Sequence, residues 1–274
     1  MFRFPIGIQL FNRPEYAERS LKSIFGQTQL VDQEKLYIFI DGFKGSTYEC
    51  MGIGDNTMYV EKLARRFFPK ANIVAFQENY GIAELHNMLQ QAAFTGPEQW
   101  SVFFEEDVEL DPQYLEELSN LVDIVQDYEQ IVRVACFQIL PSLYHLPRGN
   151  VGFYPGHGTK AFAERKSFFQ EKQSIVNIFL KLAAKNLGSP EQFNDTQNSS
   201  EMALMGHFLP YFQHDSLIES FLNSKSKLHV VTKPYLARDI GAKGMNNYVV
   251  PSIKKDLLSS KSENEFFFAK TRIS

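Results

Sequence analysis

The sequence predicts an α/β protein with a mostly parallel sheet flanked by helices. Over roughly the first 130 residues, short segments rich in β-branched and aromatic residues alternate with segments whose apolar residues have helical spacing. That alternation favours parallel strands joined by right-handed crossovers. The clearest strand, residues 100–104, reads as a buried parallel strand and ends abruptly in three acids, Glu105, Glu106 and Asp107. With 274 residues, the chain is long enough to bury a large core.

The first half contains four expected strands and four expected helices. The strands are residues 4–11, 36–40, 73–76 and 100–104. The first helix follows Asn12-Arg13-Pro14, which places Pro in an early turn, and the second follows a capping Asp55 and stops at Pro69. The third follows Asn79-Tyr80-Gly81, and the fourth starts at Asp111-Pro112.

The second half reads differently. We expect a strand over residues 131–139, a glycine-rich turn over 153–158 and then a helix through Phe179. An exposed polar loop over 187–200 precedes a helix opened by His214-Asp215. The remaining expected pieces are a strand over 229–232, a basic loop over 241–246 and a charged tail.

Composition excludes several classes of protein. A formal net charge of -4 gives no reason to expect nucleic acid as the main partner. Cys50 and Cys136 are too few for a disulfide framework or a thiolate metal site, and we expect reduced thiols in a cytoplasmic protein. Residues 1–8 do not form a signal peptide, and no apolar run reaches membrane-spanning length.

The three acids after residue 104, here called the acid motif (Glu105, Glu106 and Asp107), indicate a ligand site. Adjacent carboxylates repel one another, and a divalent cation removes that penalty while sharing its ligands with substrate phosphates. In open α/β sheets, ligands bind beyond the carboxyl ends of the strands. No GxGxxG or GxxxxGK[ST] occurs, so neither dinucleotide nor P-loop chemistry is indicated. The alternative is a solvated acidic turn.

Several of these motifs resemble those of GT-A glycosyltransferases. Residues 5–14 resemble the opening strand and turn of that family, and Phe39-Ile40-Asp41-Gly42 resembles its second strand. The acid motif stands where the family has its DXD-type metal motif. The nearest type is N-acetylglucosaminyltransferase I, whose motif is Glu-Asp-Asp and whose acceptor-side turn resembles residues 153–158. The resemblance runs from residue 4 to 246, and it departs from that type at Glu106 and at His214.

The resemblance implies roles for the nucleotide half of the site. Asp107 would bind Mn²⁺ or Mg²⁺ and bridge it to the donor diphosphate, while Glu105 would face the donor sugar and Glu106 the ribose. Asp41 would accept from a pyrimidine N–H, and Arg13 would hold the base or its phosphate. Four of these residues also have a plain structural reading: the two glutamates would lend charge near the site without contacting the ligand, Asp41 would end a strand in a turn, and Arg13 would cap a helix.

Four further residues complete the predicted site. His86 falls where the resembled enzyme has a histidine at the nucleotide, although a lone helical histidine is more often structural. Asp215 is the candidate base for the acceptor hydroxyl, with a helix N-cap as its alternative. Lys243 or Arg238 would steady the departing diphosphate from a closing loop, unless each is a solvated loop charge.

The function implied is a metal-dependent glycosyltransferase that moves a sugar from a UDP-sugar donor to an acceptor hydroxyl with inversion. Residues 1–128 would bind the nucleotide sugar, 129–250 would face a saccharide or glycoconjugate acceptor, and 251–274 would form a tail. The alternatives are a nucleotidyltransferase and a non-catalytic sugar-binding or nucleotide-sugar-binding protein. Because the substitution of Asp107 would relieve repulsion among three adjacent acids, it is expected to leave the fold intact.

Overall fold

The computed structural model describes residues 1–136, 152–154, 160–186, 214–231 and 236–241, with the backbone alone for 152–154, 182–186 and 214–216. Outside this part of the chain lie residues 155–158 of the predicted glycine-rich turn (153–158), the polar loop, Lys243 and the tail. The division at residues 128 and 250 therefore stays a prediction.

Eight of the ten described strands form one sheet. Its order is β3 (Asn72–Ala75), β2 (Leu36–Ile40), β1 (Ile6–Leu10), β4 (Trp100–Glu105), β8 (Ala161–Arg165), β6 (Ile131–Ala135), β9 (Leu228–Val231) and β7 (Gly152–Tyr154). The first four strands are parallel, and so are β6 and β9. β8 runs antiparallel to both of its neighbours, and β7 runs antiparallel to β9. The predicted α/β class with a mostly parallel sheet is confirmed.

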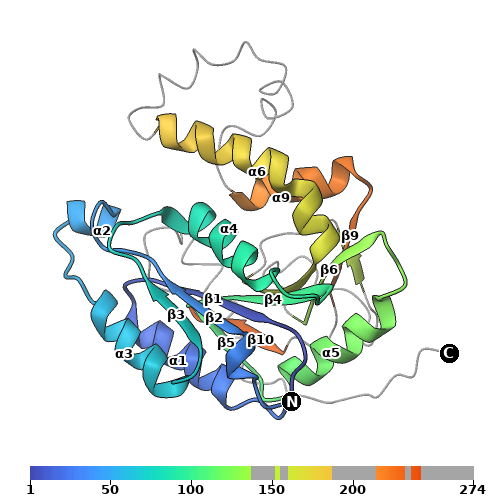
Figure 1. The fold of residues 1–274 in the computed structure, drawn as a ribbon, viewed down its shortest axis with the longest axis horizontal. Coiled ribbons are helices and arrows are strands. Elements are labelled where there is room, and N and C mark those ends of the chain that lie inside the picture. The colour runs from blue at the N-terminus through green and yellow to red at the C-terminus, as the bar shows by residue number, and fades with distance from the viewer. Residues whose placement is uncertain (137–151, 155–159, 187–213, 232–235, 242–274) are drawn as a thin grey trace, which may run out of the picture.

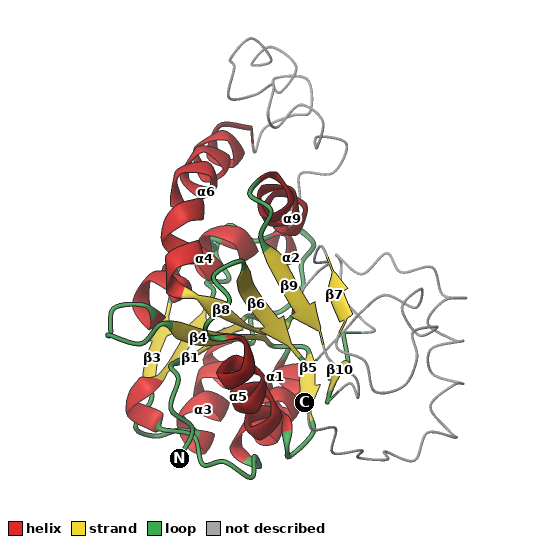
Figure 2. Cartoon of the chain, turned by 90° about the vertical axis from the view of Figure 1, so that its right-hand side faces the viewer, coloured by secondary structure: helices red, strands yellow, loops and turns green. Residues whose placement is uncertain are grey.

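Helices cover both faces of the sheet (Figures 1 and 2). On one face lie α1 (Pro14–Phe25), α3 (Thr57–Phe67) and α5 (Tyr114–Val125), and on the other lie α4 (Gly81–Ala93), α6 (Lys166–Asn186) and α9 (His214–Ser224). The larger core packs apolar residues of α1, α3 and α5 against the strands. A smaller, aromatic-rich core packs α4 and Phe169 of α6 against the other face, around Phe103 and Phe162. Short helices α2 (Thr47–Cys50) and η1 (Gln33–Lys35) flank β2.

The strands predicted in the first half all form, with ends shifted by one or two residues. Four short strands were not predicted: β5 (Val108–Leu110), β7, β8 and β10 (Ala237–Asp239). β7 includes residues 153 and 154, which the sequence placed in a glycine-rich turn, and they form a strand because they pair with β9. β10 pairs antiparallel with β5, so a late segment of the chain returns to the residues directly after the acid motif. The second helix begins at Thr57 with Asn56 as N-cap, while Asp55 accepts a hydrogen bond from the Thr57 backbone N–H at 2.9 Å.

The strand order reverses between β1 and β4. The chain passes from β1 outward through β2 to β3 and then returns to place β4 on the other side of β1. β1 and β4 lie close together here: a Cβ on Gly7 would stand 2.8 Å from the Phe103 ring and 2.9 Å from Leu89. In open α/β sheets, this point of reversal is where a crevice opens beyond the carboxyl ends of the strands.

A buried ionic cluster ties β8 to its surroundings. Glu164 accepts hydrogen bonds from Lys172 Nζ at 2.6 Å, Arg133 Nε at 2.6 Å and Gln90 Nε2 at 3.0 Å. Burial alone would raise the pKa of Glu164, but the charges of Lys172 and Arg133 outweigh it and lower that pKa. Next to Arg133 in register, His229 is buried, and neither ring nitrogen has a partner among the residues that the structure describes. Burial lowers its pKa to about 3.

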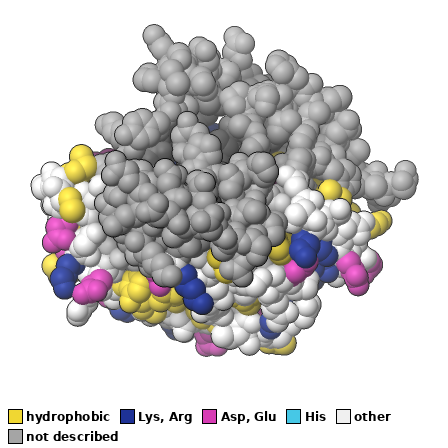
Figure 3. All heavy atoms as spheres, turned by 90° about the horizontal axis from the view of Figure 1, so that it is seen from above, with side chains coloured by type: hydrophobic (Ala, Val, Ile, Leu, Met, Phe, Trp, Pro, Cys, Tyr) yellow, Lys and Arg dark blue, Asp and Glu magenta, His cyan; other side chains and the backbone are white. Residues whose placement is uncertain are grey.

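Among the described helices, none is long and apolar enough to cross a membrane. Cys50 is exposed, Cys136 is buried, and the two are not joined in a disulfide. On the coloured part of the surface in Figure 3, acidic and basic side chains lie interspersed with apolar ones.

Candidate functional site

The acid motif lies at the carboxyl end of β4, beside the carboxyl end of β1. In the register of these strands, Gln9 of β1 pairs with Glu105. The turn that follows β1, residues 11–13, and the turn that follows β4, residues 106–107, therefore leave the sheet next to each other, at the switch point.

Glu106 joins these two turns. Its Oε2 accepts a hydrogen bond from the Phe11 backbone N–H at 2.9 Å, and its Oε1 accepts from Arg13 Nε. Glu106 is buried, and desolvation raises its pKa, with the charge of Arg13 as the main opposing effect. Both carboxylate oxygens of Glu106 therefore accept hydrogen bonds from the chain itself. The predicted contact of Glu106 with ribose stays a prediction.

Asp107 is the centre of the cluster. Its Oδ2 accepts from Lys160 Nζ at 2.9 Å and from Arg13 Nη2 at 3.2 Å. Its Oδ1 is buried and has no partner in the described part of the protein. A buried carboxylate oxygen without a partner is costly, and a ligand that supplies a positive charge or a donor there would relieve that cost.

Lys160 was not predicted from the sequence, yet its ammonium contacts two acids of the cluster. Besides Asp107, its Nζ donates to Asp239 Oδ1 at 3.2 Å, and its backbone oxygen accepts from Glu105 N at 3.0 Å. Lys160 stands directly before β8, and Asp239 ends β10. The glycine-rich turn predicted over 153–158 precedes Lys160 in sequence but gives it no role, so only the pairing of β8 with β4 reveals its place at the cluster.

The acids control the protonation of both cations. Burial opposes the charged forms, but Glu106 and Asp107 together raise the pKa of Arg13, and Asp107, Glu105 and Asp239 together raise that of Lys160. With every carboxylate ionised, the four acids and these two cations carry a formal net charge of −2. The three adjacent acids are therefore not simply crowded like charges, because two cations from two other segments, Arg13 and Lys160, offset part of their repulsion.

Asp41 follows β2 at the same edge of the sheet. Its Oδ1 accepts from the backbone N–H groups of Gly42 at 2.9 Å and Tyr80 at 2.8 Å, and its Oδ2 accepts from Gly81 N at 3.0 Å and Asn79 Nδ2 at 2.9 Å. Burial raises the pKa of Asp41 in spite of these bonds. Asp41 thus holds the loop at the start of α4, and its contact with a nucleotide base stays a prediction.

His86 is buried on α4 between aromatic side chains. Its ring lies 5.5 Å from that of Phe103 and 6.0 Å from that of Phe162, centroid to centroid, and its Nδ1 lies 3.3 Å from Gln9 Oε1. These contacts give His86 a packing role below the strand ends. Its predicted place at the nucleotide is not tested by them.

The acceptor-side predictions are only partly described. α9 begins at His214 as expected, which puts Asp215 in its first turn, but the Asp215 side chain is not described. Lys243 lies outside the described residues.

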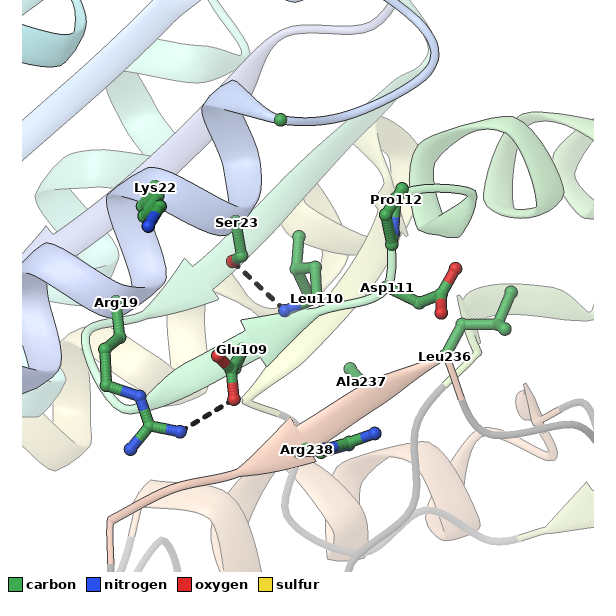
Figure 4. Close-up of a pocket in the computed structure, with 11 residues that line it drawn as sticks. Arg19, Lys22, Ser23, Glu109, Leu110, Asp111, Pro112, Leu236, Ala237 and Arg238 are labelled. Atoms are coloured by element: carbon green, nitrogen blue, oxygen red, sulfur yellow. Dashed lines mark hydrogen bonds and ion pairs between the residues drawn. The ribbon is translucent and has the colours of Figure 1, made fainter. Parts of the chain in front are cut away.

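Arg238 lies next to Asp239 on β10 and faces the other way. Strand alternation sends Asp239 toward Lys160, while Arg238 lines a pocket of about 470 Å³ with Arg19 and Lys22 of α1 (Figure 4). Glu109 on the same pocket wall pairs with Arg19 at 2.7 Å. This pocket contains none of the acid motif, so we do not regard it as the nucleotide site.

The groups at Asp107 fit a divalent cation that takes few of its ligands from the protein. No group of three or more His, Cys, Asp or Glu side chains that could hold a metal occurs in the described part of the chain. A cation that takes one carboxylate oxygen from the protein and its other ligands from phosphates and water needs no such group. The unpaired Oδ1 of Asp107 and the net negative charge suit that mode.

No protein family and no characterised protein matches this chain in sequence. Among solved structures, the chain is similar to residues 1–349 of S. aureus TarS in complex with UDP-GlcNAc, with 10% identity, a TM-score of 0.49, and coverage of 89% of this chain and 62% of that one. It is also similar to the mannosyltransferase PcManGT from Pyrobaculum calidifontis in complex with GDP-Man and Mn2+, with 14% identity, a TM-score of 0.45, and coverage of 62% and 46%. A longer S. aureus TarS structure matches with 11% identity, a TM-score of 0.47, and coverage of 84% and 35%. The chain spans less than two thirds of each of these solved proteins.

Proposed function

We propose that this chain is a GT-A glycosyltransferase that moves a sugar from a UDP-sugar to an acceptor hydroxyl. The observation that carries the proposal is the meeting of the acid motif with Arg13 at the switch point of the sheet, where Asp107 keeps one carboxylate oxygen unpaired. This is where nucleotides bind in open α/β sheets. The N-acetylglucosaminyltransferase I type is part of the proposal and rests on the sequence resemblance.

The reaction leaves negative charge on the departing nucleoside diphosphate, and the cluster offers cations to meet it. Arg13 and Lys160 lie at Asp107 and stay protonated throughout the neutral range, because the acids raise their pKa values. A divalent cation at Asp107 would add Lewis-acid stabilisation of the diphosphate. Glu106 acts by fixing the Arg13 guanidinium, and we assign Glu105, half-buried at the end of β4, to the side of the donor sugar.

The base would lie beyond the end of β2. Asp41 holds residues 79–81 through backbone and side-chain bonds, so this loop and Asp41 together form a wall at the end of β2, on the edge of the sheet that carries the acid motif. We assign the uracil to this wall. A rigid wall of backbone groups favours one base over others, because a mismatched base leaves buried polar groups unpaired.

The acceptor base is assigned to Asp215. The pairings make β9 parallel to β6, and β6 parallel to β4 through the shared antiparallel neighbour β8, so all three strands end at the same edge. α9 leads into β9 after three residues and packs over Val132 of β6. A helix that reverses so tightly into a strand starts near that strand's carboxyl end, so we expect Asp215 at the edge that holds Asp107. A carboxylate there would take the proton of the acceptor hydroxyl during in-line attack, with inversion.

Hydrolysis of nucleotide sugars tests the proposal without knowledge of the acceptor. The purified chain is incubated with a panel of UDP-, GDP- and other nucleotide sugars, with Mn²⁺, with Mg²⁺ and with a chelator. Release of free sugar and nucleoside diphosphate, dependent on metal and fastest with a UDP-sugar, is the expected result. Sugar phosphate with nucleoside monophosphate would indicate a nucleotidyltransferase-type cleavage between the phosphates. Binding without turnover would indicate a binding protein.

A further inference from the structure

Lys160 lies beside Asp107, so a divalent cation that binds there would compete with its ammonium for the Asp107 carboxylate. Its ammonium lies 2.9 Å from Asp107 Oδ2 and 3.2 Å from Asp239 Oδ1. The side chain is only 14% exposed, and the backbone bond between Lys160 and Glu105 fixes its base against β4. The ammonium is thus a built-in counter-ion of the acid motif, not a surface lysine that swings past it.

This position has opposite consequences in the free and the nucleotide-bound protein. Without nucleotide, the ammonium cancels much of the attraction that Asp107 exerts on a divalent cation. A bound diphosphate brings negative charge to the same place, and the ammonium then attracts the phosphates that complete the metal's ligands. One lysine therefore opposes metal alone and supports metal and nucleotide together.

We propose that Lys160 couples the binding of the divalent cation to that of the nucleotide, keeping the metal affinity of the free protein low. The inference rests on the proposed function. By linkage, the factor by which the nucleotide raises metal affinity equals the factor by which the metal raises nucleotide affinity.

The experiment measures binding, not turnover. Free Mn²⁺ is followed by electron paramagnetic resonance, and UDP binding by calorimetry, each ligand being titrated alone and in the presence of the other. In the wild type we expect weak binding of Mn²⁺ alone and much tighter binding with UDP. Lys160→Met keeps the aliphatic stem without the charge. It should raise affinity for Mn²⁺ alone on the order of 10-fold, the effect of one unit charge a few ångströms away in a water-like dielectric. It should weaken UDP binding, and the coupling factor should shrink accordingly.

Two variants serve as controls. Lys160→Arg retains the charge and should retain the coupling. Lys35→Met removes a lysine that also forms an ion pair, with Glu98, but does so at the amino ends of the strands, and should bind both ligands as the wild type does.

The outcomes separate the two proposals. A wild type that binds UDP and Mn²⁺ independently overturns the inference whatever the variants do, including a Lys160→Met that fails to fold. Unchanged Mn²⁺ affinity and coupling in a folded Lys160→Met also overturn it, while the proposed function stands. A wild type that binds no nucleotide, with or without metal, refutes the proposed function and the inference with it.

Discussion

Replacing Asp107 with asparagine changes one acceptor atom and keeps the shape of the side chain. The sequence predicts that this variant keeps its fold, because the substitution relieves repulsion within the acid motif. The structure alters this expectation, since Asp107 is the shared partner of Lys160 and Arg13. The amide oxygen can still accept from one of them, but the new amide group would take the place of the unpaired Oδ1 and lack an acceptor. Hydrogen bonds to charged groups contribute about 1.5–3 kcal/mol each, so we expect the free energy of unfolding to fall by about 1–3 kcal/mol.

The same substitution removes the charge that a divalent cation would contact. At a separation of about 2 Å, a unit charge and a divalent ion attract each other by about 4 kcal/mol even in a dielectric like that of water. We therefore expect the affinity for Mn²⁺ in the presence of UDP to fall roughly 10³-fold.

Urea denaturation gives the stability, and calorimetric titration of Mn²⁺ into protein with UDP gives the affinity. The matched control is Asp123→Asn, because Asp123 also pairs with an arginine, Arg3, but in solvent. Its pair should contribute at most about 1 kcal/mol, and its loss should leave metal binding unchanged. If Asp107→Asn binds Mn²⁺ with UDP as tightly as the wild type does, the assignment of the metal to Asp107 is wrong. If it is as stable as Asp123→Asn, the ion pairs at Asp107 do not stabilise the fold.

Three further predictions concern the surrounding structure. Asp41→Asn leaves one oxygen for four donors, so the amides of Tyr80 and Gly81 should lose protection in hydrogen exchange; unchanged protection would remove Asp41 as the anchor of that loop. Glu164→Gln leaves the buried charges of Lys172 and Arg133 without a negative partner. It should lower the free energy of unfolding, measured by urea denaturation, by about 3–5 kcal/mol. The matched Glu18→Gln, whose partner Arg66 is exposed, should cost less than about 1 kcal/mol, and equal losses would contradict the argument. Because the pKa of buried His229 falls from 6.5 to about 3, the unfolded chain binds a proton there that the native chain does not, so stability should fall as pH drops through that range. His229→Leu should flatten this part of the pH–stability curve, and an unchanged slope would assign the loss to other groups.

Apolar runs made much of the fold predictable. β1, β2 and β4 are buried strands written as short apolar segments, and α1 and α5 show helical spacing, so local pattern and tertiary structure agree there. β8 and β10 were missed for a physical reason. β8 buries a charged Glu164 that only its ionic partners make tolerable, and β10 has the sequence Ala-Arg-Asp, which has no strand pattern.

The acid motif and Arg13 could be singled out in the sequence, whereas Lys160 and Asp239 could not. Adjacent acids at the end of an apolar strand are easily recognised in a sequence, because their mutual repulsion has to be offset by a positive charge. Lys160 and Asp239 lie 53 and 132 residues beyond Asp107 and carry no motif, so only the sheet brings them together. Asp41 was placed at the correct strand end, but its four donors, three of them nearly forty residues later, could not be read from an Asp-Gly pair.

The four segments that build the charge cluster are synthesised at different times, so the cluster assembles in steps. A ribosome adds about 5–20 residues per second, and domains begin to fold as they emerge. Arg13 and Asp107 can meet once β4 has joined β1, but Lys160 must wait for β8 and Asp239 for β10. Until then the nascent chain carries the full acid motif with one of its two cations. The counter-charge at Asp107 is therefore completed only after β8 has been synthesised and has paired with β4, so a nascent chain that ends before Lys160 presents a different binding site from one that includes it.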